Sequence, residues 1–167
     1  MTKNNSEVIL ILDNVRSAFN VGNIFRTSEA LGVKKIICVG ITPHYREKLD
    51  PRLPHIITKT ELKLNKTALG AEQFIEYAYF PRIEDEIIKY KQKGYTVLSL
   101  EQTKNSISLN SYRPESKIVL IVGNEVNGIS QPVLALSDLI LEINQTGQKE
   151  SLNVTNATAI ALFYLLG

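Results

Sequence analysis

Three polar segments of the chain carry the residue types that transfer chemistry requires. Residues 20–27 hold two asparagines and Arg26, and residues 123–130 hold two glycines and Glu125. Residues 143–157 are rich in amides and hydroxyls. None of the three contains a histidine, the commonest general base. Arg26 is therefore a candidate for binding phosphate or stabilising negative charge, and Glu125 for holding a positive group or an internal hydrogen-bond donor.

Each polar candidate also has an ordinary structural explanation. Asn20 and Ser151 stand where helices are expected to begin, and both residue types are common N-caps. Asn153 would lie in the first turn after Ser151, although asparagine is a mediocre helix former. Asn156 and Thr158 extend a polar stripe along a helix that is otherwise apolar. Such a stripe indicates a polar partner, either a ligand or another helix.

The glycine-containing segment resembles a phosphate-binding loop only in its spacing. Gly123 and Gly128 have the separation of the two P-loop glycines, and Ser130 follows. Ile129 replaces the lysine that must reach the phosphates, and Glu125 would bring negative charge to an anion site. The chain also has no Gly-x-Gly, which argues against a Rossmann dinucleotide site. A nucleotide or phosphate-ester enzyme is therefore the least favoured of the functional interpretations. The loop could still wrap a neutral or cationic ligand.

Apolar runs of strand length alternate with helical patterns and position these segments. Strands are expected at residues 8–12, 35–39, 74–77, 95–100, 118–122 and 139–143, and helices at 20–31, 62–69, 81–90 and 152–166, the third starting at Pro81. Residues 41–60 contain three prolines and are expected to form a long excursion. The alternation predicts an α/β fold with a mostly parallel sheet covered by helices on both faces. Ligands of such sheets bind beyond the carboxyl ends of the strands, which here means the loops after Asp13, Leu100, Val122 and Ile143.

Composition limits the class of protein. The chain has 167 residues and 18.7 kDa, with 44% hydrophobic and 22% charged residues, which fits one globular domain over 1–167. Cys38 is the only cysteine and there are two histidines, so neither an internal disulfide nor a metal site is expected. The polar stretch 1–7 is unlike a secretory signal, and no apolar run is long enough for a membrane span. These features predict a cytoplasmic protein.

Positive charge is concentrated between residues 42 and 66. This window contains six Lys or Arg and three Asp or Glu, so its net charge is +3 within a chain whose total is +2. Arg46, Arg52 and Lys59 are the candidate contacts to a phosphate-bearing ligand. The alternative is an ordinary solvated loop.

Together, the three polar segments resemble the motifs of the SpoU/TrmH family of RNA ribose methyltransferases, within the SPOUT superfamily. Residues 20–27, 123–128 and 151–155 correspond to its three motifs, in the right order and at the ends of expected elements. Residues 67–71 resemble the small-residue segment between the first two motifs. The likeness covers nearly the whole chain, from Val8 to Leu166.

The resemblance implies a C-terminal trefoil knot that binds S-adenosylmethionine, and a homodimer with its active site at the subunit interface. It assigns five residues to the cofactor pocket: Leu100, Gly123, Gly128, Ile143 and Leu152. The implied reaction is methyl transfer to a ribose 2′-hydroxyl of tRNA or rRNA; the alternative is a catalytically silent RNA-binding homologue. No appended RNA-binding domain is expected, so the catalytic domain would contact the RNA itself.

The family assigns the role of base to the arginine that matches Arg26. A guanidinium gives up its proton only above about pH 12, so Arg26 is equally a candidate for stabilising the developing alkoxide and holding phosphate. Asn20 and Asn153 would fix Arg26 or the ribose, Glu125 would organise its own loop or orient Arg26, and Ser151 would contact substrate or cap the helix.

The sequence departs from the family pattern at two places. Asn144 and Gln145 follow Ile143 where relatives often have Pro-Met. Thr155, Asn156 and Thr158 replace small apolar residues after the third motif. These changes are expected to alter the polarity of the pocket or the packing of the dimer.

Overall fold

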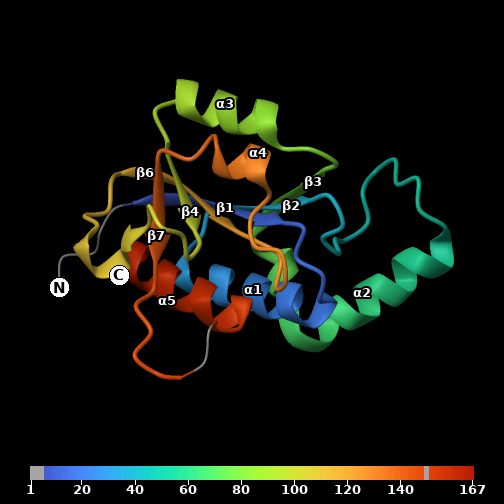
Figure 1. The fold of residues 1–167 in the computed structure, drawn as a ribbon. Helices are drawn as coiled ribbons and strands as arrows, with labels where there is room; N and C mark the ends of the chain where they lie inside the picture. Colours follow the sequence, from blue (N-terminus) through green and yellow to red (C-terminus); the bar gives the residue numbers. More distant parts are fainter. Residues whose placement is uncertain (1–5, 149–150) are drawn as a thin grey trace.

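A seven-stranded parallel sheet forms the centre of the molecule, in the order β3-β2-β1-β6-β4-β7-β5. The computed structural model describes residues 6–148 and 151–167. Helices α1, α2 and α5 cover one face of the sheet, and α3 and α4 cover the other (Figure 1). The predicted α/β fold with helices on both faces is therefore confirmed.

The elements have the following bounds. The strands are β1 Glu7–Asp13, β2 Lys35–Val39, β3 Glu76–Phe80, β4 Thr96–Leu100, β5 Ile107–Ser108, β6 Lys117–Val122 and β7 Leu139–Glu142. The α-helices are α1 Ala18–Leu31, α2 Pro54–Ala68, α3 Glu84–Gln92, α4 Gln131–Leu134 and α5 Val154–Leu166. Two 3₁₀ turns, η1 Ala71–Gln73 and η2 Leu109–Ser111, complete the set.

The central strand β1 shows why its sequence is apolar throughout. Val8, Leu10 and Leu12 pack into the cluster beneath α1 and α5, whereas Ile9 and Ile11 pack into the cluster beneath α3 and α4. Successive side chains of a strand point to opposite faces, so a strand buried on both faces must be apolar at every position.

Several predicted boundaries are wrong, each for a local reason. Helix α1 begins at Ala18, because Ser17 is its N-cap and accepts a hydrogen bond from the Asn20 N–H; Asn20 therefore lies within the helix. Helix α5 begins at Val154 with Asn153 as its N-cap, so Ser151 does not cap it. In both cases two residues suited to capping lie close together in the sequence.

The middle of the chain also differs from the prediction. Helix α2 begins at Pro54, which shortens the expected excursion over 41–60, and proline suits the first turn of a helix. Pro81 precedes helix α3 rather than starting it, and the strand expected at 74–77 is β3. The short elements β5, η1, η2 and α4 were not predicted. The trefoil knot, which strand order does not test, stays a prediction.

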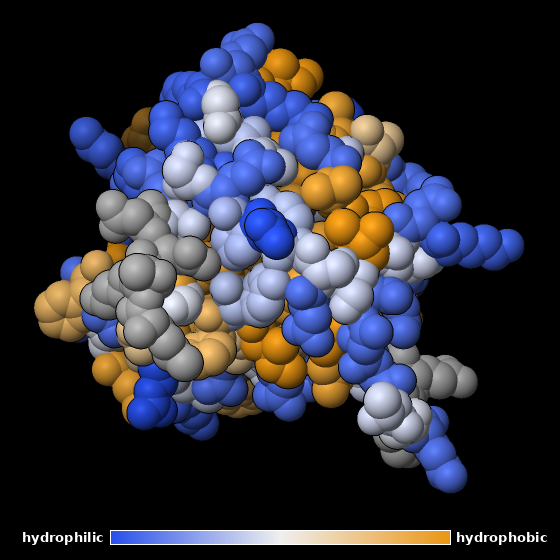
Figure 2. All heavy atoms as spheres, turned by 90° about the vertical axis from the view of Figure 1, so that its left-hand side faces the viewer, coloured by the Kyte–Doolittle hydropathy of each residue, from blue (hydrophilic) through white to orange (hydrophobic). Residues whose placement is uncertain are grey.

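The surface combines hydrophilic residues with exposed large apolar side chains. Figure 2 views the side that carries β7, where hydrophobic residues appear in patches between hydrophilic ones. In residues 6–148 and 151–167, no helix has both the length and the apolar character needed to cross a bilayer.

Close packing of α1 on α2 depends on Gly22. A Cβ atom at Gly22 would overlap Thr67 Oγ1 and the Leu64 carbonyl oxygen of α2. Replacing glycine by alanine inside a helix ordinarily stabilises it by about 1 kcal/mol. Because of this overlap, the same replacement at Gly22 should destabilise the protein.

We therefore expect Gly22→Ala to lower the melting temperature. Gly147→Ala is the matched control, because a Cβ atom there meets nothing within 4 Å. Calorimetry of both variants tests the packing; a Gly22→Ala protein at least as stable as the wild type would contradict it.

Candidate active site

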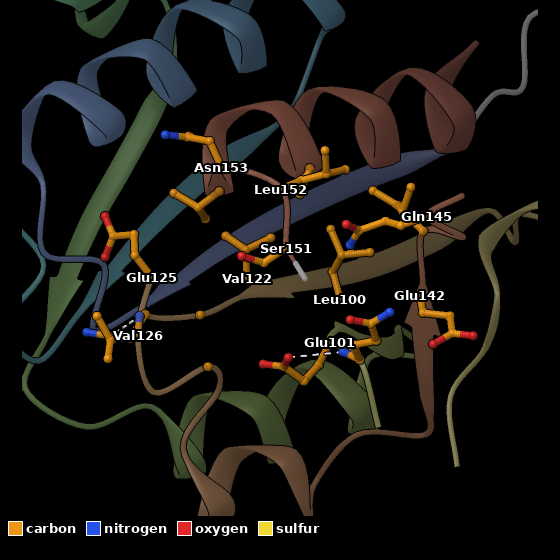
Figure 3. A pocket seen from close by; sticks show the side chains of 17 residues that line it. Leu100, Glu101, Val122, Glu125, Val126, Glu142, Gln145, Ser151, Leu152 and Asn153 are labelled. Atoms are coloured by element: carbon orange, nitrogen blue, oxygen red, sulfur yellow. Dashed lines mark hydrogen bonds between the residues drawn. The ribbon is translucent and has the colours of Figure 1, made fainter. Parts of the chain in front are cut away.

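A cavity of about 510 Å³ lies at the carboxyl ends of β4, β6 and β7 and the start of α5. Strand registers bring Leu100 of β4 level with Val122 of β6 and Leu141 of β7, so the following loops meet at one edge. The five residues predicted to bind the cofactor all line this cavity: Leu100, Gly123, Gly128, Ile143 and Leu152. Glu125 and Val126 lie at one end of it, and Glu142 and Gln145 at the other (Figure 3).

The loop over residues 123–128 is closed by its own main chain. The N–H groups of Asn124 and Gly128 each donate to the other residue's carbonyl oxygen, both at 3.0 Å. The Asn124 side-chain oxygen accepts from the N–H groups of Val126 and Asn127, and its Nδ2 donates to the Asn14 carbonyl oxygen at 2.8 Å. Asn124 thus organises the loop, a role that sequence reasoning missed because one of its partners, Asn14, is distant in the chain.

The two glycines serve the loop itself. A Cβ atom at Gly123 would lie 2.5 Å from both Gly128 C and Ile129 N, so the two ends of the loop pass each other without room for a side chain. Gly128 has φ +69°, a conformation that favours glycine. The P-loop spacing in the sequence therefore reflects a compact turn.

Glu101, the residue after β4, holds the far side of this loop. Its Oε2 accepts from the Ile129 N–H at 3.0 Å, and its Oε1 accepts from the Gln102 N–H at 3.0 Å. A Cβ atom at Gly128 would overlap Glu101 Oε2, so glycine is needed there for this contact as well. Sequence reasoning missed Glu101, although its place directly after a buried strand was an available signal.

Glu125 joins the loop to the start of α1. Its carboxylate accepts from the N–H groups of Arg16 at 2.9 Å and Ser17 at 3.2 Å, and from Asn20 Nδ2 at 2.9 Å. Burial by itself raises the pKa of Glu125, but these hydrogen bonds outweigh it and hold the pKa below its ordinary value. Glu125 thus ties the 123–128 loop to the start of α1, and none of these hydrogen bonds involves Arg26.

Ser151 and Asn153 form the wall of the cavity next to α5. Asn153 Oδ1 accepts from the Thr155 N–H at 2.8 Å and from Thr155 Oγ1 at 2.6 Å, so part of its hydrogen-bonding capacity caps the helix. Of the polar stripe, Thr158 is buried and bonds the Val154 carbonyl oxygen, whereas Asn156 is exposed.

Arg26 lies away from this cavity. It is exposed and lines a separate hollow between α1 and α5, together with Asn156, Ile160 and Phe163. Both helices lie side by side on the same face of the sheet (Figure 1). Four of the five predicted catalytic residues are thus at or next to the cavity (Asn20, Glu125, Ser151 and Asn153), and within one chain Arg26 is not among them.

The three predicted RNA contacts differ in their surroundings. Arg46 and Lys59 are exposed. Arg52 is half-buried, and its guanidinium donates to both carboxylate oxygens of Asp50 and to the carbonyl oxygens of His44 and Tyr45. The hydrogen bond to Asp50 raises the pKa of Arg52, and the same pairing holds the pKa of Asp50 well below its usual range. Arg52 therefore closes the 44–52 turn instead of standing free as a phosphate contact.

The Glu125 contacts generate a stability prediction. Glu125→Gln replaces one acceptor oxygen by an NH₂ group that faces N–H donors. Hydrogen bonds to charged groups contribute roughly 1.5–3 kcal/mol, and because Glu125 is exposed we expect a smaller loss, about 1 kcal/mol of unfolding free energy.

Urea unfolding should show this loss near pH 7, with Glu29→Gln, on the exposed side of α1, as the control. The pKa of Glu125 is lowered in the folded state, so its stabilisation is present above the unfolded value of about 4.3 and disappears as the pH falls through the folded value. Wild type and variant should therefore converge in acid; a constant difference across this range would contradict the assignment.

Comparison with known proteins gives a consistent set of likenesses. The model of the SpoU rRNA Methylase family matches residues 7–163. The tRNA (guanosine(18)-2'-O)-methyltransferases of Aquifex aeolicus and Saccharomyces cerevisiae are 24% and 30% identical to the chain over 163 and 158 residues. These matches cover 98% and 93% of this chain, but 70% and 10% of the two relatives.

Solved structures show the same likeness. The AdoMet bound rRNA methyltransferase from Sinorhizobium meliloti superimposes with a TM-score of 0.76 at 27% identity. The superposition covers 95% of this chain and 55% of that one. The likeness therefore extends over nearly the whole of this chain and about half of the Sinorhizobium meliloti protein.

Proposed function

The chain belongs to the SpoU rRNA methylase family, and from this premise we propose that it transfers a methyl group from S-adenosylmethionine to a ribose 2′-hydroxyl of RNA. The observation that carries the proposal is the convergence of Leu100, Gly123, Gly128, Ile143 and Leu152 on one cavity. These five residues lie in or next to three loops, and the resemblance to the family assigned them to the cofactor.

The cavity has the size and charge for this cofactor. Its volume of about 510 Å³ lies within the usual range for small-molecule sites, roughly 300–1,000 Å³. Leu100, Ile143 and Leu152 supply apolar walls. Glu101, Glu125 and Glu142 are the only charged residues among the described ones that line it. Such walls suit a cationic sulfonium and disfavour a nucleotide phosphate, which argues against a phosphate-ester enzyme.

S-adenosylmethionine, when bound, supplies an activated methyl group, so the protein must orient the ribose and manage one proton. Asn20 Nδ2 donates to Glu125, which directs Asn20 Oδ1 to accept a hydrogen bond from elsewhere, and we assign it to the ribose. Ser151 and Asn153 line the same cavity. Orientation of this kind can contribute roughly 7–11 kcal/mol to lowering a barrier.

The active site is proposed to be completed by a second copy of the chain. Arg26 lies in the α1–α5 hollow, beside Ile160 at 44% and Phe163 at 69% exposure. Exposed apolar side chains beside Arg26 support a homodimer in which Arg26 of one subunit reaches the other subunit's cavity. There it would stabilise the developing alkoxide or hold the adjacent phosphate.

The proposed substrate is tRNA, since the relatives from Aquifex aeolicus and Saccharomyces cerevisiae are named for guanosine 18 of tRNA. The segment matched by the family model would act as the catalytic domain, in the cytoplasm where such RNA is used. Arg46 and Lys59 are proposed as RNA contacts, while Arg52 supports their loop.

Cofactor binding is tested by thermal shift. At a concentration 100 times its Kd, S-adenosylhomocysteine should stabilise the fold by about 2.7 kcal/mol, or on the order of 5–10 °C in melting temperature. Gly123→Val should abolish the shift, because its side chain would collide with Gly128 and Ile129 across the loop. Gly147→Val is the control, since its Cβ position is open. An equal shift for ATP, or an unchanged shift in Gly123→Val, would overturn the assignment of the cavity.

The shared active site is tested by mixing subunits. Arg26→Ala and Gly123→Val should each be inactive in methylating a tRNA transcript. Refolding or co-expressing them together should restore activity, because mixed dimers contain one intact cavity facing one intact Arg26. If Arg26 acts in its own subunit's cavity, no mixed dimer has a complete site and activity stays absent. Wild-type protein that binds RNA and cofactor without transferring a methyl group would instead indicate a silent homologue.

A further inference from the structure

A further hollow of about 310 Å³, distinct from the α1–α5 hollow that Arg26 lines, adjoins the candidate active site. It is called the hollow from here on. It lies between the first turn of α1, the loop before residue 44 and the outer side of α2. Its lining includes Arg16, Phe19, Ile56, Lys59 and Lys63. Of these, only Lys59 was singled out from the sequence, because the charge count of residues 42–66 does not reveal which cations face α1.

The charge of this hollow is uniformly positive. Arg16, Lys59 and Lys63 are exposed, and no Asp or Glu is among its described lining residues. None of the three cations forms a salt bridge within residues 6–148 and 151–167. Arg52 differs from these three cations, because its guanidinium forms a salt bridge with Asp50. A hollow with three unneutralised cations attracts an anion, and phosphate is the anion that RNA presents.

Phe19 adds an aromatic surface to the same hollow. Its side chain is 45% exposed, whereas Val21, Ile24 and Phe25 of the same helix are buried. Thr67 Oγ1 donates to the Phe19 carbonyl oxygen at 2.9 Å, which ties its backbone to α2. An exposed aromatic ring beside cations is the combination on which proteins stack unpaired bases while binding the neighbouring phosphates.

The hollow and the cavity share a wall. The backbone N–H groups of Arg16 and Ser17 donate hydrogen bonds to the Glu125 carboxylate. Glu125 lines the cavity, whereas Arg16 and Ser17 line the hollow. A ribose held next to Asn20 and Glu125 would thus place a neighbouring nucleotide of the same strand at the hollow.

Resting on the proposed function, we propose that this hollow binds the nucleotide adjacent to the methylated one in an unstacked conformation. Its base stacks on Phe19, and its phosphate lies between Arg16, Lys59 and Lys63. The substrate region recognised here is therefore single-stranded, because a base held in a duplex cannot present its face to the ring.

Direct binding measurements separate the two parts of the hollow. The probes are a short single-stranded RNA of mixed sequence and a duplex of the same length, each titrated at several salt concentrations. Phe19→Ala and Phe19→Leu should weaken single-strand binding about 5- to 100-fold with the salt slope unchanged, whereas Phe19→Tyr should retain wild-type affinity. Duplex binding should not depend on the ring.

The cations should behave in the opposite way. Lys59→Ala with Lys63→Ala should weaken binding and reduce the salt slope by about 0.7 per lost phosphate contact. Lys66→Ala, on the same helix but outside the hollow, is the matched control. The thermal shift with S-adenosylhomocysteine should be unchanged in every variant, which confirms that each is folded and that the cavity is intact.

Three results would overturn the proposal. These are wild-type affinity in both Phe19→Ala and the double lysine variant, an equal loss in Lys66→Ala, or an equal dependence on Phe19 for duplex and single strand. If these occur while the wild type still binds S-adenosylhomocysteine and methylates RNA, the proposed function stands and only the hollow is misassigned. A wild-type protein that binds neither cofactor nor RNA would overturn both.

Discussion

Beyond the carboxyl ends of β1 and β6, the main chain no longer has hydrogen-bond partners within the sheet. Side chains supply these partners instead, and their contacts fix the loops of the site. Asp13 is buried, and its carboxylate accepts from Asn14 Nδ2 and from the Ser130 N–H. Asn124 donates back to the Asn14 carbonyl oxygen. Because buried polar groups without partners are costly, these crossed contacts hold the two strand ends and the 123–128 loop in one arrangement. The same loop lines the cavity.

Charge is divided between two neighbouring compartments. The cavity is bordered by carboxylates and the adjoining hollow by cations, so each repels the ligand that suits the other. Such a division fits a reaction that joins a cationic methyl donor to a polyanionic acceptor. The Glu125 carboxylate lies at the boundary, where hydrogen bonds from three amide N–H donors stabilise its negative charge.

The sequence predicts the layers of the fold better than the contacts that complete the site. Strand β6 is apolar at nearly every position, so its burial on both faces could be predicted, whereas the two-residue strand β5 is too short to show any period. The motif positions indicated Leu152 and Gly123 correctly as neighbours of one cavity. Glu101 and Asn124 escaped notice because their partners are distant in the chain. Arg52 was counted as a free cation because charge counting ignores geometry, and Asp50 lies only two residues away.

The position of Glu125 makes the two proposed sites mechanically dependent on each other. It lines the cavity through its side chain and fixes, through the N–H groups of Arg16 and Ser17, the segment that forms one wall of the hollow. A ligand that orders the 123–128 loop would therefore also order the entrance of α1, without any movement of the sheet. Phe19 and Lys63 lie beyond this link, so changing them alters the affinity for RNA alone. A cofactor held against Glu125 and an RNA strand held in the hollow would therefore both bear on the same three hydrogen bonds, which gives coupling between the two ligands one direct route within the chain.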